Sequence, residues 1–522
     1  MYSNFIKKTI DFLNDEQKEL RKNYAKILNS PDIALLKEGT AISNAVIISE
    51  DSNTYTFSYS PQFVKIKEEQ SIVLVNQEDR QKVGVAEVLK IDYLKHQVTL
   101  IFYKNPYNSF YNTDKFLLIQ DNGIFPKAVH DSLYKMAESH EVPLLVQRVI
   151  DREPNIKTYE NSSIENIIKT ASNMNNSFMV IHGPPGAGKT YTSKKVIADL
   201  LKKNKRILIT SNSHSAINNL VDAIEIKDFK GLKIYSRDQH KASHPSVKNS
   251  QIRGEEISSE LKDYDLVAGT CFSLAKITDQ SFDYLFVDEA SQIKLAFILS
   301  VLKVVKNVVI MGDHLQLTSI SPIAIRPEGD AVLNYILEDH QILPKKYGYF
   351  LNTTYRCEPQ IAKVVSDVYY NSQLKWSQTK KKEGFTVIKT KHNLSSKMNE
   401  VEGKEVLKIY KSLRRKKVKP EDIIIIAPYN AQVSYLKNII NNDKTTIGSV
   451  DLIQGGEAKY VIISFTVAGK SAEDGAFVSN KNRVNVAISR AKDKVFMVMS
   501  EKLPESKHVC PTFKKLLKIV DQ

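Results

Sequence analysis

GPPGAGKT, at residues 183–190, is the stretch that decides the fold of this 522-residue chain. It fits the pattern G-x-x-x-x-G-K-[ST] and lies between an apolar run, SFMVIH (177–182), and a helix-like segment, TYTSKKVIADLLKK (190–203). A strand, a glycine-rich turn and a helix in this order form a phosphate-binding loop, whose backbone N–H groups face phosphate oxygens. The helix that follows adds its positive N-terminal end. The sequence therefore predicts a nucleotide site in an α/β fold.

The residues of this loop share the task of holding a nucleoside triphosphate. Lys189 supplies a positive charge for the β- and γ-phosphates, and Thr190 offers its hydroxyl to Mg²⁺. We therefore expect ATP and Mg²⁺ as cofactors. The predicted nucleotide-binding residues of the loop are Gly183, Pro184, Pro185, Gly186, Ala187, Gly188, Lys189, Thr190 and Tyr191.

A second apolar strand ends in two carboxylates, in FDYLFVDEAS (282–291). Burial makes carboxylates costly, and a nearby Mg²⁺–ATP complex supplies a reason for the pair. Asp288 is predicted to hold the metal, directly or through water, and Glu289 to orient and deprotonate the attacking water. A solvated strand end is the alternative for this pair alone, but its combination with GPPGAGKT favours the metal site.

Composition indicates the kind of partner. Lys and Arg total 74 against 59 Asp and Glu, so the formal net charge is +15. This surplus favours a polyanionic partner over a role in solubility alone. The N-terminal segment lacks the apolar core of a signal peptide, and no apolar run reaches membrane-spanning length. The three cysteines are far apart and indicate reduced thiols, so we expect a cytoplasmic protein with no membrane partner.

Hydrophobic periodicity divides the chain into five segments. Apolar residues recur at helical spacing near the N-terminus, and short alternating stretches then predict a small antiparallel barrel. Strands that alternate with helices predict two α/β domains with parallel sheets. The expected segments are a helical stalk (1–31), a β-barrel (32–120), linker helices (121–159), a first α/β domain (160–345) and a second α/β domain (346–522).

The phosphate-binding loop and the carboxylates leave kinase, GTPase and motor open. Phosphoryl transfer needs positive charge on the leaving γ-phosphate. Two arginines from beyond the first α/β domain are candidates, Arg356 in LNTTYRCEP and Arg490 in NRVNVAISRAK. Arginines from a second domain make hydrolysis depend on domain closure, which is how a motor couples chemistry to movement. A kinase predicts no such second domain.

An ordered series of blocks resembles helicase superfamily 1, in the branch of the nonsense-mediated-decay helicase and its bacterial and viral relatives. The blocks are GPPGAGKT (183–190), TSNSHSAINNL (210–220), AGTC (268–271), DEAS (288–291), GDHLQL (312–317), TYRCEPQI (354–361), IAPYNAQ (426–432), VDLIQGGEAKYVIIS (450–464) and NRVNVAISRAK (482–492). The resemblance implies two RecA-like motor domains with ATP between them. It also implies 5′ to 3′ movement on single-stranded or tailed duplex DNA or RNA.

The resemblance also implies roles for individual residues. Gln316 senses the γ-phosphate, Tyr355 stacks on the base, Glu457 contacts the ribose or couples the nucleotide to the second domain, and Arg490 is the arginine finger. The implied catalytic set is Lys189, Asp288, Glu289, Gln316, Arg356 and Arg490. The implied nucleic-acid contacts are Ser211, Asn212 and Thr270, which are small and polar.

Three positions depart from the family pattern. The family has a glutamine that reads adenine upstream of the phosphate loop, and here NSSIEN (161–166) places Ile164 there. Glu358 replaces a histidine in YRCEP, and QGGE replaces QGRE. No phosphate-contacting residue is lost, so we expect intact catalysis with weaker selection of ATP over other nucleotides.

Some alternatives remain open at the level of sequence. The same motifs suit a translocase that unwinds duplexes and a nucleotide-gated clamp that binds single strands or remodels nucleoprotein with little unwinding. The aromatic and basic stretch 101–116 and the lysines at 380–382 suit either nucleic-acid contact or ordinary packing and solvation. His182 and His214 are expected to be structural.

Overall fold

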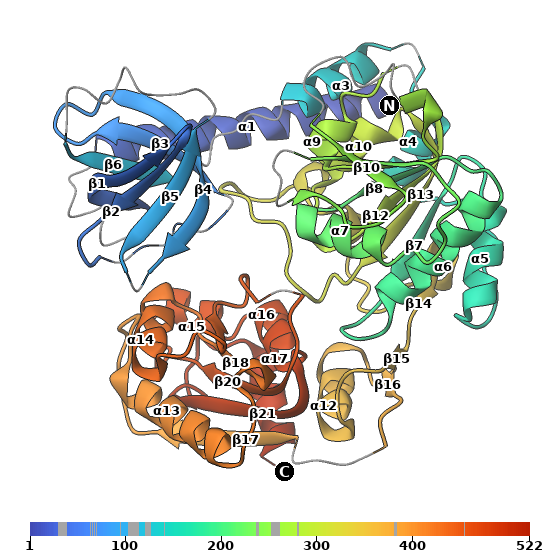
Figure 1. The fold of residues 1–522 in the computed structure, drawn as a ribbon. Coiled ribbons are helices and arrows are strands. Elements are labelled where there is room, and N and C mark those ends of the chain that lie inside the picture. Colours follow the sequence, from blue (N-terminus) through green and yellow to red (C-terminus); the bar gives the residue numbers. More distant parts are fainter. Residues whose placement is uncertain are drawn as a thin grey trace.

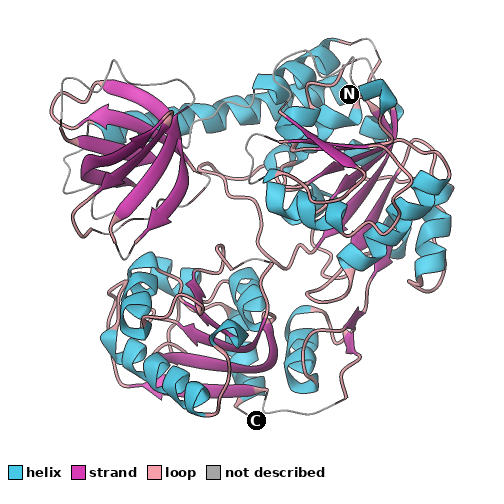
Figure 2. Ribbon diagram, viewed as in Figure 1, coloured by secondary structure: helices cyan, strands magenta, loops and turns pink. Residues whose placement is uncertain are grey.

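The computed structural model describes residues 1–29, 39–62, 64, 66, 68, 70–93, 95–102, 114–120, 127–139, 141–235, 240–251, 261–278, 281–379, 384–453 and 455–521. A long N-terminal helix runs from a small β-barrel to the first of two α/β domains, and the second α/β domain lies below both (Figure 1). Helices and strands alternate in both α/β domains, whereas the barrel consists of strands (Figure 2). The chain is thus an α/β protein with two parallel sheets, as the sequence predicts.

The N-terminal segment forms one continuous helix, α1 (Tyr2–Leu28). Ile6, Ile10 and Leu13 are buried in a cluster with α3 (Lys127–Glu138) and α4 (Leu144–Asp151), so the first half of α1 is fixed to the first α/β domain. Asp15 also accepts a hydrogen bond from Arg326 at 2.9 Å. None of the described helices is both long enough and apolar enough to cross a membrane.

The barrel is closed and antiparallel, with strand order β1-β2-β5-β4-β3-β6. Its strands are β1 (Ala41–Asp51), β2 (Thr54–Ser58), β3 (Ser71–Asn76), β4 (Lys82–Asp92), β5 (Gln97–Phe102) and β6 (Phe116–Gln120). Phe102 and Phe116 lie inside it, with edge-on contacts to Tyr55 at 5.4 Å and to Phe57 at 5.8 Å. These two rings of the aromatic stretch therefore pack the barrel. The rings at 103–113 and the lysines at 380–382 lie outside the described residues.

The first α/β domain has an eight-stranded sheet in the order β10-β9-β11-β8-β12-β13-β7-β14, in which every pair of neighbours is parallel. The strands are β7 (Phe178–His182), β8 (Ile207–Thr210), β9 (Gly231–Ile234), β10 (Val247–Ser250), β11 (Leu266–Ala268), β12 (Phe282–Val287), β13 (Val305–Gly312) and β14 (Gly348–Phe350). Both faces of the sheet are buried, which explains the uninterrupted apolar runs. Phe178 and Val180 face one core cluster, and Met179 and Ile181 face the other.

Strand β14 lies beyond residue 345, where the sequence placed the end of this domain. It adds to the edge of the sheet beside β7. Gly348 allows this approach, because a Cβ at this position would lie 2.0 Å from the carbonyl oxygen of Val180 and its φ is +146°. The first sheet therefore ends at Phe350.

The second α/β domain has a five-stranded parallel sheet in the order β17-β21-β20-β18-β19. Its strands are β17 (Phe385–Thr390), β18 (Ile423–Ile426), β19 (Thr446–Gly448), β20 (Ala458–Ser464) and β21 (Ala491–Ser500). Its helices are α12 (Pro359–Tyr369), α13 (Glu400–Arg415), α14 (Asn430–Ile440), α15 (Ala472–Val478), α16 (Lys481–Ile488) and α17 (Pro511–Val520). Leu315 and Leu317, which follow β13 of the first domain, are buried in the core of this second domain.

Candidate active site

The phosphate-binding loop connects β7 to α6 (Lys189–Lys202), as the pattern at 183–190 predicts. Gly186 and Gly188 have φ values of +72° and +84°, which favour glycine. The Nζ atom of Lys189 donates to the carbonyl oxygen of Gly183 at 2.6 Å, so the ammonium lies over the loop. Thr190 is exposed at the start of the helix, where its hydroxyl is accessible to a ligand. The loop thus presents a cation, a hydroxyl and a helix N-terminus on one side.

The two carboxylates follow β12, which lies two strands from β7 in the sheet. Burial and the neighbouring Glu289 raise the pKa of Asp288 to about 7, and Lys189 opposes the rise. Glu289 has a φ of 51°, and its N–H donates to Oδ1 of Asp288 at 2.9 Å. A buried carboxylate beside a second one is stabilised by a cation. The hydroxyl of Thr190 and the oxygens of Asp288 are the hard donors that Mg²⁺ prefers, so this pair of residues fits that ion.

A buried hydrogen-bond network lies behind the phosphate-binding loop and is centred on Asp313, directly after β13. Oδ1 of Asp313 lies 3.2 Å from Nε2 of His182, the last residue of β7. Oδ2 accepts from the Tyr370 hydroxyl at 2.6 Å and from Nε2 of Gln316 at 3.0 Å. The Asn485 amide donates to the Tyr370 hydroxyl at 3.1 Å. The network therefore joins the phosphate loop of the first domain to α12 and α16 of the second.

Electrostatics indicates how this network is charged. Burial raises the pKa of the Asp313 carboxyl, but the hydrogen bond and charge of His182, with Lys189 and His314 nearby, outweigh burial and hold that pKa below its ordinary value. His182, Asp313 and His314 offer nitrogen and oxygen atoms within 4.8 Å of one another, as in some metal sites. Both oxygens of Asp313 already accept hydrogen bonds from other groups, so the cluster serves as a structural network.

Gln316 lies between the network and Arg490. Its Nε2 donates to Asp313, and its Oε1 accepts from Nη2 of Arg490 at 3.4 Å. Because Asp313 accepts from the amide nitrogen, the amide oxygen must face the arginine. The structure therefore places the predicted γ-phosphate sensor in contact with the predicted arginine finger.

The two arginines reach the first domain from the second half of the chain. A Cβ at Gly186 would lie 2.5 Å from Cβ of Arg356, so Arg356 packs on the phosphate-binding loop. Arg490 is buried and donates to the Gly456 carbonyl at 3.2 Å. Burial and then Arg356 lower the pKa of Arg490 to about 10, whereas Glu289 opposes this shift. Arg490 thus lies within electrostatic reach of Glu289, whereas the guanidinium of Arg356 bonds to Glu457 and to the Ser489 carbonyl of its own domain.

Glu457 bridges basic residues instead of standing alone. Its Oε2 accepts from Nε of Arg356 at 2.8 Å, and its Oε1 lies 2.5 Å from Nζ of Lys492. This geometry links Glu457 to the arginine beside the phosphate loop, which suits the coupling role that the resemblance implies more directly than a ribose contact.

The segment that carries Arg356 is also bonded to the loop through its backbone. The N–H of Tyr355 donates to the Gly186 carbonyl at 2.9 Å, and the Thr354 hydroxyl donates to the Pro185 carbonyl at 2.9 Å. The second half of the chain therefore contacts the phosphate loop at Pro185 and Gly186.

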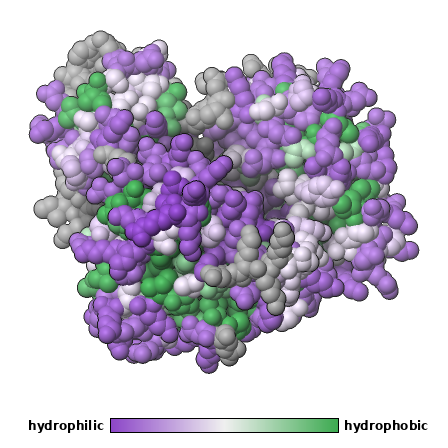
Figure 3. All heavy atoms as spheres, turned by 60° about the horizontal axis from the view of Figure 1, so that its bottom comes forward, coloured by the Kyte–Doolittle hydropathy of each residue, from purple (hydrophilic) through white to green (hydrophobic). Residues whose placement is uncertain are grey.

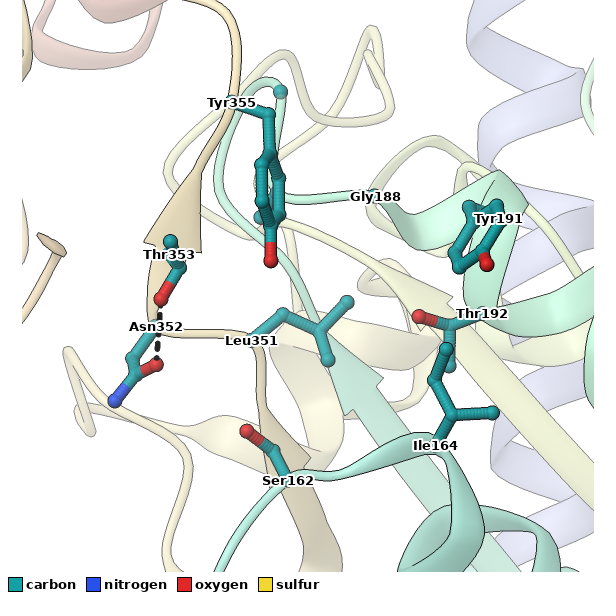
Figure 4. Close-up of a pocket in the computed structure, with 11 residues that line it drawn as sticks. Ser162, Ile164, Gly188, Tyr191, Thr192, Leu351, Asn352, Thr353 and Tyr355 are labelled. Atoms are coloured by element: carbon teal, nitrogen blue, oxygen red, sulfur yellow. Dashed lines mark hydrogen bonds between the residues drawn. The ribbon is translucent and has the colours of Figure 1, made fainter. Parts of the chain in front are cut away.

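A pocket of about 500 Å³ opens beside the loop. Tyr355 and Tyr191 stand on opposite sides of it, with Leu351 between them and Ile164 and Ser162 along the lower edge (Figure 4). Tyr355 is 60% exposed, so its ring is available to a flat ligand. Ile164 presents only methyl groups where an adenine-reading glutamine is expected. The remaining lining residues are Gly186, Ala187, Gly188, Thr192, Asn352 and Thr353.

Comparison with known proteins places this site in a family. Residues 165–322 and residues 332–502 each match a family described as an AAA domain. The Arabidopsis thaliana DNA replication ATP-dependent helicase/nuclease JHS1 is 24% identical over 460 residues, which cover 79% of this chain and 34% of that protein. The Saccharomyces cerevisiae ATP-dependent helicase NAM7 is 26% identical, over 67% of this chain and 43% of that protein. The chain belongs to helicase superfamily 1.

Within superfamily 1, the chain lies in the branch that includes the Regulator of nonsense transcripts 1 homolog of Neurospora crassa, which is 26% identical over 61% of this chain. The chain spans less than half the length of these curated relatives. Among solved structures, the arterivirus nonstructural protein 10 helicase is similar at 12% identity, covering 82% of this chain and 76% of that one with a TM-score of 0.43.

The predicted nucleic-acid contacts of this superfamily 1 chain lie at the carboxyl ends of β8 and β11. Asn212 is exposed and its amide donates to Oε1 of Gln292, and Thr270 is partly exposed at the start of α9 (Cys271–Leu274). Ser211 is buried, and its hydroxyl donates to the Asp288 carbonyl at 3.1 Å. The side chain of Ser211 is therefore not available to a phosphate, because it is buried and bonded to the backbone of Asp288.

Sequence reasoning missed the partners in the Asp313 network. Tyr370 and Asn485 are buried, and His182 is buried as the structural reading expected. Tyr370 and Asp313 are 57 positions apart, and His182 and Asp313 are 131 apart, so spacing gave no signal. The one available signal was that His182 adjoins a quoted block and that Asp313 and Asn485 each lie in one, whereas Tyr370 lies outside all of them.

Proposed function

We propose that the chain is an ATP-dependent helicase that moves 5′ to 3′ along one strand of DNA or RNA. The observation that carries this proposal is the meeting of the two α/β domains at the site, where Arg356 packs on the phosphate-binding loop and Arg490 contacts Gln316. An NTPase whose site is complete only when two domains meet converts hydrolysis into domain movement. The relatives are described as ATP-dependent helicases, which supports the same function.

Each residue of the site has a role in ATP hydrolysis. Lys189 binds the β- and γ-phosphates, and Thr190 and Asp288 would hold Mg²⁺, which would neutralise phosphate charge. Glu289 accepts the proton of the attacking water. Arg490 stabilises the charge that develops on the γ-phosphate. Gln316 senses that phosphate and holds the guanidinium group of Arg490.

Domain movement follows from the contacts that cross the cleft. The hydrogen bonds from Tyr355 and Thr354 to the phosphate loop add to the Asp313 network, and each such bond contributes only about 1 kcal/mol. A bound triphosphate adds charge-assisted bonds to both arginines and closes the cleft. Hydrolysis removes these charge-assisted bonds, so the closed state loses its advantage over the open state and the cleft opens.

A nucleotide-gated clamp is the alternative function, since it uses the same site. A strand-displacement assay separates the two. The helicase proposal expects unwinding of a duplex with a 5′ single-stranded tail, none with a 3′ tail, and none with Lys189→Ala. Binding of single strands that depends on ATP, without displacement of either duplex, favours the clamp.

Stimulation of ATP hydrolysis by nucleic acid tests the wider claim. Turnover is measured without nucleic acid and with matched DNA and RNA single strands of one sequence. We expect at least one of them to stimulate ATP hydrolysis, and the stronger stimulator is the nucleic acid along which the protein moves. Equal turnover in all three conditions contradicts the proposal.

A further inference from the structure

A connecting loop at residues 318–327, here termed the strap, runs from the Gln316 sensor to the stalk helix. At its start, Leu315 and Leu317 are buried in the core of the second domain, and the N–H of Ser319 donates to the Ser291 carbonyl at 3.1 Å. At its end, Arg326 donates to Asp15 of α1 at 2.9 Å. Both ends of the strap are therefore fixed, one to the second domain and to Ser291, and the other to the stalk helix.

The middle of the strap is apolar and exposed. Ile320 is 77% exposed and Ile325 is 50% exposed, and Pro322 and Ala324 are also exposed. The sequence from Leu315 to Ile325 contains no charged residue. Single exposed apolar residues are common on proteins, but several on one anchored segment indicate a binding surface. Because no carboxylate lies in this stretch, the strap does not repel a polyanion.

The position of the strap indicates what covers it. Its ribbon crosses the space between the barrel and the two α/β domains (Figure 1), and the surface is hollowed where these lobes meet (Figure 3). Ser319 is bonded to Ser291, which precedes Gln292, and Gln292 is bonded to the exposed amide of Asn212. The strap therefore begins beside the edge that carries Asn212, one of the residues predicted to meet a nucleic-acid backbone, and ends at the stalk helix.

We propose that Ile320 and Ile325 contact the bases of the single strand, an inference that rests on the proposed function. Isoleucine has no hydrogen-bond donor for phosphate, whereas the faces of unpaired bases are apolar, and isoleucine is among the side chains that wedge between bases. The strap begins two residues after Gln316, so a shift of the γ-phosphate sensor is transmitted to the residues on the bases.

A comparison of intact and abasic strands tests this contact. Affinity of the full-length chain is measured for a fluorescent single strand and for the same strand with its central bases removed, which keeps every phosphate. We expect the wild-type chain to bind the intact strand about tenfold more tightly, the size of one good base contact. In the double variant Ile320→Ser/Ile325→Ser, this preference is lost, while affinity for the abasic strand equals that of the wild type.

Matched controls use apolar residues that are exposed to a similar degree elsewhere. Leu144 on α4 is 47% exposed and Val401 on α13 is 40% exposed. Leu144→Ser and Val401→Ser are expected to keep the full preference for the intact strand, and the unfolding midpoint of every variant shows whether it folds.

The outcomes separate the two claims. If the wild-type chain binds strands and is stimulated by them, but shows no preference for intact strands, the strap proposal is overturned and the proposed function stands. A preference that survives in the double variant also overturns it and leaves a protein partner as the occupant of the strap. Absence of strand binding in the wild type instead contradicts the proposed function itself.

Discussion

At the scale of single residues, the site depends on two adjacent, half-buried carboxylates, Asp288 and Glu289. Glu289 follows Asp288 in a left-handed conformation and faces the side on which the arginines lie. Replacing its carboxylate with an amide keeps the size and removes the base. We expect Glu289→Gln to bind ATP normally and to hydrolyse it roughly 10²- to 10⁴-fold more slowly in single-turnover measurements. An unchanged rate would show that Glu289 is not the base.

The base pocket gives a second prediction at this scale. Ile164 lines the pocket but offers no hydrogen bond, so adenine and guanine meet the same methyl groups. We expect similar kcat/KM values for ATP and GTP in the wild-type chain. Ile164→Gln supplies a donor and an acceptor and should raise the ATP to GTP ratio roughly tenfold. A wild-type chain that already rejects GTP would mean that Ser162, Asn352 or Thr353 reads the base.

At the scale of elements, the Asp313 network holds the sensor loop on the second domain. Tyr370 donates to a buried carboxylate, so Tyr370→Phe should lower the free energy of unfolding by about 2 kcal/mol in urea titrations. The neighbouring Tyr369 is a matched control, because its buried hydroxyl has no hydrogen-bond partner among the described residues. Tyr369→Phe should leave stability unchanged or slightly higher. An equal decrease in the free energy of unfolding in both variants would show that the Tyr370 hydroxyl contributes no more to stability than that of Tyr369.

Strand β9 carries a pH-dependent contribution to stability. Lys233 is fully buried in it, with Nζ 3.2 Å from Nδ1 of His214, and burial lowers the pKa of Lys233 to about 7. The unfolded chain keeps this proton up to about pH 10.4, so between these values the unfolded state binds more protons and stability rises with pH.

Lys233→Met should remove this contribution. The stability of the wild type relative to the variant should rise by on the order of 1 kcal/mol per pH unit above about pH 7.5, and it should be constant below about pH 6.5. Urea unfolding across this range measures the slope. Parallel curves for the two proteins would show that Lys233 is charged when buried.

The strands also show which elements of the fold can be predicted from the sequence. Strands made of apolar runs, such as Phe178–His182, are predicted from the sequence because parallel strands covered on both faces contain little else. Strands β9 and β10 were missed, since GLKI contains a lysine and VKNS is largely polar. Their pairing is set by neighbouring strands in the sheet, which local periodicity does not report. β14 was missed for a related reason, as its place depends on Gly348 fitting against Val180.

At the scale of the whole molecule, the first sheet carries the phosphate-binding loop and the carboxylate pair, and the second domain brings Arg490 to Gln316. The motif residues of the site were predictable, because each phosphate and metal contact demands a particular residue at a particular spacing. The network that joins the domains was not, since Asp313, Tyr370 and Asn485 meet only through the fold. Asn482 adds to it by donating to the Gln316 carbonyl at 2.6 Å.

The central claim is that a nucleotide bound by the first domain is hydrolysed only with an arginine from the second. Single-turnover hydrolysis of ATP by Arg490→Ala, in the presence of a stimulating single strand, tests it most directly. We expect a rate roughly 10³-fold or more below that of the wild type, with nucleotide affinity retained, because the arginine acts on charge that develops in the transition state. Hydrolysis within a few fold of the wild-type rate would contradict the account.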